Sequence, residues 1–134
     1  MIRAVLDTNV LISGLFWKGP SRQIVDLAVV GKIKAITSTE ILEEVEAVLY
    51  EDFPAIPYER IESIIRDILS YSRVVIAREI VVKGLRDPGD AKIISCAVSA
   101  QADYIITGDK DLLILEKYKE VTILNPRAFL ILLK

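Results

Sequence analysis

The stretch Met1-Ile-Arg-Ala-Val-Leu-Asp-Thr-Asn-Val-Leu-Ile12 decides the fold. Residues 2–6 are apolar except for one arginine, which is typical of a short strand buried on both faces. The run ends at Asp7, and the apolar residues from Val10 onward predict a helix. Open α/β sheets usually carry their chemistry at the carboxyl ends of their strands, so Asp7 is a candidate site residue. It is equally a candidate helix cap, because Asp, Thr and Asn all cap helices well.

The composition predicts one folded domain that covers residues 1–134 and lies outside membranes. A hydrophobic fraction of 52% and a charged fraction of 27% are typical of globular proteins. No apolar run approaches the ~20 residues that cross a bilayer, and the amino terminus lacks the pattern of a signal peptide. The single cysteine, Cys96, leaves no internal disulfide and is read as small core filler. We therefore expect a cytoplasmic protein.

Two absences restrict the chemistry. The chain has no histidine and one cysteine, so a typical zinc site and a Ser-His or Cys-His pair are excluded. Carboxylates must do the work, and hard oxygen ligands suit Mg²⁺ or Mn²⁺. The net charge of −2 does not exclude a nucleic-acid partner. If five acids held cations, the 17 Lys and Arg residues would outnumber the remaining acids.

Apolar periodicity predicts alternating strands and helices along the rest of the chain. We expect strands at 34–37, 73–77, 104–106 and 121–124, and helices at 21–31, 38–50, 58–70, 91–102, 112–115 and from 126 onward. This alternation predicts a single-domain α/β fold with a central, mostly parallel sheet of about five strands and helices on both faces. The spacing Thr37-Ser-Thr-Glu40 predicts a capping box, which makes Glu40 a structural helix-start residue.

Several acids converge in this arrangement. Asp7 and Asp109 follow strands, and Asp90 lies at the third position of the helix that Asp87 and Pro88 begin. Either Glu44 or Glu46 borders the buried face of the helix at 38–50, and periodicity does not choose between them. Helix-capping or solvated roles remain open for each acid. Together, carboxylates in one cleft need a divalent cation to offset their repulsion, which is the arrangement of metal-dependent phosphodiester cleavage.

The sequence resembles the PIN-domain family of nucleases, in particular the prokaryotic toxins of toxin–antitoxin pairs. Four segments carry the resemblance: Val5-Leu-Asp-Thr-Asn-Val-Leu11, Ser38–Leu49 with its Glu44, Asp87-Pro-Gly-Asp90, and Ala102-Asp-Tyr-Ile-Ile-Thr-Gly-Asp-Lys-Asp-Leu-Leu113. They occur in the family's order over nearly the whole chain. Each segment is weak alone, and the four together are specific.

The resemblance implies which residues form the site. Asp7, Glu44, Asp90 and Asp109 would be the acidic catalytic and metal-binding set, with Asp111 as an accessory fifth metal ligand. The polar residues expected to shape the site are Thr8, Asn9 and Thr107. The resemblance further implies an RNA substrate, Mg²⁺ or Mn²⁺ as cofactor, a homodimer and an antitoxin partner.

Three alternatives stay open. A non-catalytic PIN-like module that binds nucleic acid or protein would need none of this chemistry. A phosphoacceptor domain is disfavoured, because residues 2–6 contain no acid to pair with Asp7. Phe16 and Trp17 either pack in a core or dimer contact or stack on bases. The residues that bind substrate are unknown; the candidate cations are Lys18, Arg86, Lys92 and Lys110.

Overall fold

The computed structural model describes residues 1–85 and 87–134. Its strands are β1 (Arg3–Leu6), β2 (Lys34–Ser38), β3 (Ser72–Val75), β4 (Tyr104–Ile106), β5 (Lys117–Tyr118) and β6 (Val121–Leu124). Its helices are α1 (Thr8–Phe16), α2 (Pro20–Val29), α3 (Thr39–Asp52), α4 (Tyr58–Tyr71), α5 (Pro88–Ala100), α6 (Lys110–Leu113) and α7 (Pro126–Leu132).

The strands described form one sheet in the order β3-β2-β1-β4-β6-β5. All neighbouring pairs are parallel except β5 and β6, which are antiparallel. The predicted α/β class with a mostly parallel sheet is therefore confirmed. The sixth strand, β5, has only two residues and was too short to recognise by periodicity.

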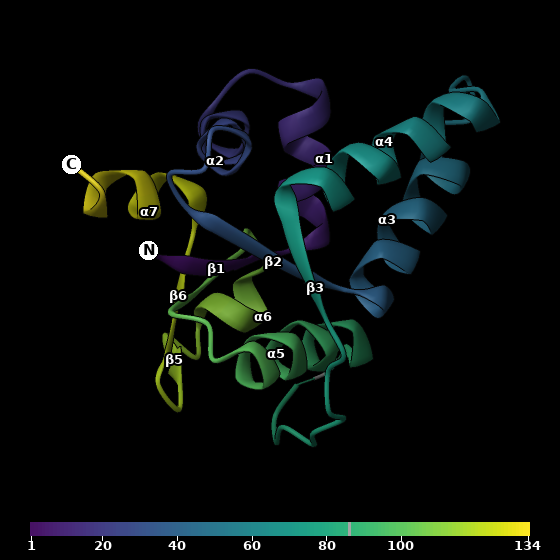
Figure 1. The fold of residues 1–134 in the computed structure, drawn as a ribbon. Coiled ribbons are helices and arrows are strands. Elements are labelled where there is room, and N and C mark those ends of the chain that lie inside the picture. Colours follow the sequence, from purple (N-terminus) through teal and green to yellow (C-terminus); the bar gives the residue numbers. More distant parts are fainter. Residues whose placement is uncertain (86) are drawn as a thin grey trace.

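Helices cover both faces of the sheet (Figure 1). The helix α5 packs on β1, β2 and β4 from one side, and α1 and α2 lie on the other, where α7 contacts α2. The central strand β1 is almost wholly buried, as its apolar sequence predicts. Arg22 joins the first two helices, because its guanidinium donates to the carbonyl oxygens of Gly14 (2.8 Å) and Leu15 (3.0 Å) at the end of α1.

Capping residues set where the helices begin, and one prediction about them was wrong. Asp87 caps α5 ahead of Pro88 as expected, accepting a hydrogen bond from the amide of Gly89. The cap of α3 is Ser38, whose hydroxyl accepts from the amide of Ile41 at 3.3 Å. The predicted capping box placed this cap one residue earlier. Glu40 therefore lies in the first turn of α3 without a capping role.

Of the two aromatic residues at the end of α1, Phe16 packs against another ring and Trp17 is largely exposed. The Phe16 ring stacks on Phe53 with ring centroids 4.7 Å apart, so it joins α1 to the end of α3. Trp17 keeps 57% of its surface exposed and is not a core residue.

Cys96 is buried in α5, as predicted. Within the residues described, no helix has the length and apolar character that crossing a membrane requires.

Candidate active site

The register of the two central strands places Asp7 beside Thr107. Leu6 of β1 pairs with Ile106 of β4, so the residues that follow these strands emerge next to each other. The hydroxyl of Thr107 donates to Asp7 Oδ2 at 2.6 Å, and the amide of Thr8 donates to Asp7 Oδ1 at 2.7 Å. Asp7 is thus the cap of α1, and its carboxylate also contacts Thr107 after β4, so its capping role is compatible with the predicted site role.

Hydrogen bonds carry this arrangement onward from Thr107 to two further acids. The Thr107 hydroxyl, which is fully buried, accepts from the amide of Asp109 at 2.9 Å. Asp109 Oδ1 in turn accepts from the amide of Asp111 at 2.8 Å, so Asp109 caps the amino terminus of the short helix α6. One threonine therefore fixes the backbone of Asp109 and the carboxylate of Asp7 at once.

Asp90 approaches the same place from α5. Its side chain is 4% exposed, and its Oδ2 atom is buried without a hydrogen-bond partner. Burial and then the neighbouring carboxyl of Asp109 raise the pKa of Asp90 to about 7. The pKa of Asp7 is also raised, chiefly by burial, although the hydrogen bonds from Thr107 and Thr8 oppose the shift.

These acids form a group that fits a divalent cation. Asp90, Asp109 and Asp111 each offer an oxygen atom, and the three atoms lie within 4.8 Å of one another. An all-carboxylate set with one oxygen left unsatisfied suits a hard cation such as Mg²⁺ or Mn²⁺. Burying a carboxylate atom without a partner costs free energy, and a cation would remove that cost. The donor set thus fits the metal that the sequence led us to expect.

Glu44 lies farther out than the buried acids. It is exposed on α3, but its charge contributes to the raised pKa of Asp7, which places it on the side of α3 that faces the site. The charge of Glu46 instead acts on Tyr50 and Tyr58, toward α4. Of the two glutamates that periodicity left open, Glu44 is the one beside the acidic site.

The remaining predicted site residues differ in how deeply they are buried and in how close they lie to the acids. Thr8 is buried in the first turn of α1, and its hydroxyl has no hydrogen-bond partner among the described residues. Asn9 is exposed on the same turn. Among the candidate cations, Lys92 lines a hollow together with Glu44 and Asp87. Lys18 and Lys110 are exposed, and Arg86 lies outside the described residues.

Two acids that line this hollow, Glu40 and Glu43, were not predicted as site residues. Glu40 lines the same hollow as Glu44, although the predicted capping box had assigned it a purely structural role. For Glu40, the sequence signal was which residue caps the helix, because a cap at Ser38 instead of Thr37 leaves Glu40 without a partner in a capping box. Threonine and serine both cap helices well. The sequence alone could not separate them.

Comparisons with known proteins identify the family and the fold. A family model described as "PIN domain" matches residues 3–111. The chain belongs to the PIN-domain family. Among solved structures, a chain of VapBC2 from Rickettsia felis, in a crystal structure with a DNA fragment from its promoter, is 13% identical with a TM-score of 0.66. That match covers 92% of this chain and 98% of the other, and it shows a PIN-like fold over nearly the full length. None of the curated proteins matches the sequence significantly.

Proposed function

We propose that this PIN-domain protein is a Mg²⁺- or Mn²⁺-dependent endoribonuclease and the toxin of a toxin–antitoxin pair. The observation that carries the proposal is the buried Oδ2 of Asp90, which has no partner and lies in a cluster with Asp109 and Asp111. Membership of the PIN-domain family supports a nuclease, and the similarity to a VapBC2 chain supports a toxin–antitoxin context.

The acids divide into holding and orienting roles. Asp90 and Asp109 would hold the cation, with Asp111 completing the set. A bound cation makes an attacking water more acidic and offsets the negative charge on a phosphate. Asp7 accepts one hydrogen bond at each oxygen atom, so its carboxylate is pre-organised, and its remaining lone pairs would hold the cation directly or through a water molecule. Glu44, exposed at the rim, would position the attacking water.

The proposal extends to partners that follow from the same similarity. We infer an antitoxin partner and a homodimer, with RNA as the substrate. The single cysteine of the chain favours a reducing cytoplasm as the place of action. A non-catalytic binding module is the alternative, and no described feature favours it over the nuclease.

The test is cleavage of a panel of single-stranded and structured RNA and DNA by the purified protein. Each reaction is run with Mg²⁺, Mn²⁺ or EDTA, using the wild type, Asp90→Asn and the control Asp26→Asn, which removes an exposed acid on α2. We expect metal-dependent cleavage of RNA that Asp90→Asn abolishes and Asp26→Asn retains. Cleavage that persists in EDTA, or binding without cleavage in every metal, would refute the proposal.

A further inference from the structure

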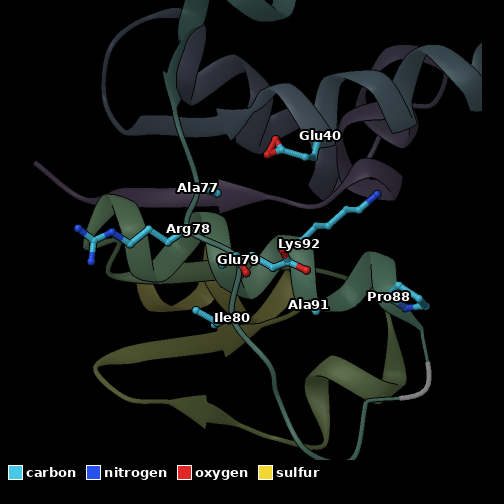
Figure 2. Close-up of a pocket in the computed structure, with 9 residues that line it drawn as sticks. Glu40, Ala77, Arg78, Glu79, Ile80, Pro88, Ala91 and Lys92 are labelled. Atoms are coloured by element: carbon cyan, nitrogen blue, oxygen red, sulfur yellow. The ribbon is translucent and has the colours of Figure 1, made fainter.

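A pocket of about 480 Å³ lies between α5, α3 and the extended segment 77–80 (Figure 2). Ala91, Lys92 and Ser95 line it from α5, and Glu40 lines it from the first turn of α3. Its volume is in the range of sites for small organic molecules, roughly 300–1,000 Å³. We call it the inner pocket. It is large enough for one nucleobase with its sugar.

The inner pocket adjoins the candidate active site through a second hollow of about 440 Å³. Glu40, Pro88 and Lys92 line both hollows. The second hollow, which we call the outer hollow, also includes Glu44 and Asp87, and Glu44 is the acid whose charge acts on Asp7. The two hollows therefore share part of their lining, and the outer hollow extends to Glu44 at the rim of the acidic site.

The two hollows differ in charge. Two acidic and two basic side chains line the inner pocket, and its other lining residues are small, apolar or uncharged. The outer hollow is lined by four acidic residues, Glu40, Glu43, Glu44 and Asp87, and Lys92 is the one basic residue that lines it among those the structure describes. A balanced, half-apolar pocket suits an uncharged aromatic base better than a phosphate. In the outer hollow, Lys92 is the cation that a phosphate would contact.

Glu40 is free to recognise a ligand. Its role as a helix-capping residue is excluded by the Ser38 cap, and within residues 1–85 and 87–134 no hydrogen bond or ion pair engages its carboxylate. An ionised carboxylate accepts hydrogen bonds and donates none. The Watson–Crick edge of guanine offers two adjacent donors, the ring N1–H and the amino group, which one carboxylate accepts together, whereas adenine, cytosine and uracil each offer a single donor group there.

We propose that the inner pocket binds the base of the nucleotide next to the cleaved bond, with Glu40 selecting guanine. This inference rests on the proposed nuclease function and adds a substrate preference to it. Lys92, at the junction of the two hollows, holds the phosphate that connects this nucleotide to the one at the acidic site. Only an unstacked, unpaired base can enter, so the substrate is single-stranded at this position.

The experiment measures binding separately from cleavage. Fluorescently labelled RNA octamers, either all uridine or with one adenosine, cytidine or guanosine, are titrated in Mg²⁺ against protein carrying Asp90→Asn to prevent cutting. In this background we compare Glu40→Gln with Glu46→Gln, a matched change on the same helix but facing α4. We also compare Ala91→Leu, which fills the inner pocket, with Ala47→Leu on the exposed side of α3.

We expect the octamer with guanosine to bind about tenfold more tightly than the all-uridine octamer and the octamers with adenosine or cytidine. Glu40→Gln should reduce this preference to less than about threefold, because an amide both donates and accepts. Ala91→Leu should abolish it, and both controls should retain it. A preference that is absent from the starting protein, or that survives in Glu40→Gln and Ala91→Leu, overturns the inference.

Cleavage by the protein without Asp90→Asn separates the two proposals. Metal-dependent cutting whose base preference is unchanged by Glu40→Gln and Ala91→Leu refutes the pocket and leaves the nuclease standing. Failure to cut any RNA in any metal refutes the nuclease. In that case the binding titrations still decide whether the pocket selects a base.

Discussion

Replacing Asp90 with asparagine should make the metal-free protein more stable at neutral and higher pH, although the same change should abolish cleavage. The carboxylate is 4% exposed, it lies against the carboxyl of Asp109, and one of its oxygens has no partner. In the absence of a cation, ionising this group in the folded protein is unfavourable. An amide keeps the shape of the side chain and removes the charge.

The pH dependence follows from the raised pKa of Asp90. The folded-state pKa is about 7, whereas the ordinary value is 3.8, so the native state holds this proton more strongly than the unfolded chain does. Stability therefore decreases as pH rises from about 4 to about 7 and then levels off. At 1.36 kcal/mol per pKa unit, the loss at pH 8 is at most about 4 kcal/mol, because Asp90 titrates together with the neighbouring Asp109. The raised pKa of Asp7 acts in the same direction.

The assay is urea unfolding at pH 5 and pH 8, in EDTA and in Mg²⁺, for the wild type, Asp90→Asn and Asp26→Asn. In EDTA, the wild type and Asp26→Asn should lose stability between pH 5 and pH 8, and Asp90→Asn should lose less. Mg²⁺ should stabilise the wild type at pH 8 and have little effect on Asp90→Asn. A wild type that is equally stable at both pH values in EDTA would refute the raised pKa of Asp90, and equal stabilisation of all three proteins by Mg²⁺ would show that Asp90 binds no cation.

Three further substitutions test the packing around the site. Thr107→Val should lower the free energy of unfolding by about 1–3 kcal/mol in urea titrations, because it removes a donor to Asp7 and an acceptor for Asp109, whereas Thr107→Ser should stay near the wild type. Arg22→Met should cost about 2 kcal/mol in the same assay by leaving two carbonyls of α1 without donors; a loss no larger than that of the exposed Arg66→Met would contradict this. Phe129→Ala should cost about 3–5 kcal/mol in thermal unfolding, because Phe129 is fully buried and packs edge-on against Tyr104. An unchanged melting temperature would show that α7, which lies beyond the matched family region, is dispensable.

Local sequence patterns predicted most of the fold because the signals for helices and strands act over a few residues. The apolar run before Asp7 predicted β1, and Asp87 with Pro88 predicted the start of α5. The two-residue strand β5 escaped, because alternation cannot be read from two positions. The cap of α3 was predicted one residue early, because Thr37 and Ser38 both suit the position. As a result, Glu40 was predicted to be a capping residue and was not considered as a residue that lines a pocket. The choice between equivalent local signals depends on packing.

By itself, the sequence determined the order of strands and helices, the absence of histidine chemistry and the acids that follow the strands. Only the tertiary structure decided which acids meet. The Leu6–Ile106 pairing places Asp7 and Thr107 in contact across 100 residues of chain, and α5 brings Asp90 to Asp109. It also grouped Asp111 with Asp90 and Asp109, and it left Asp7 outside this group of three. Strand pairing and helix packing are non-local, so no pattern along the chain could specify them.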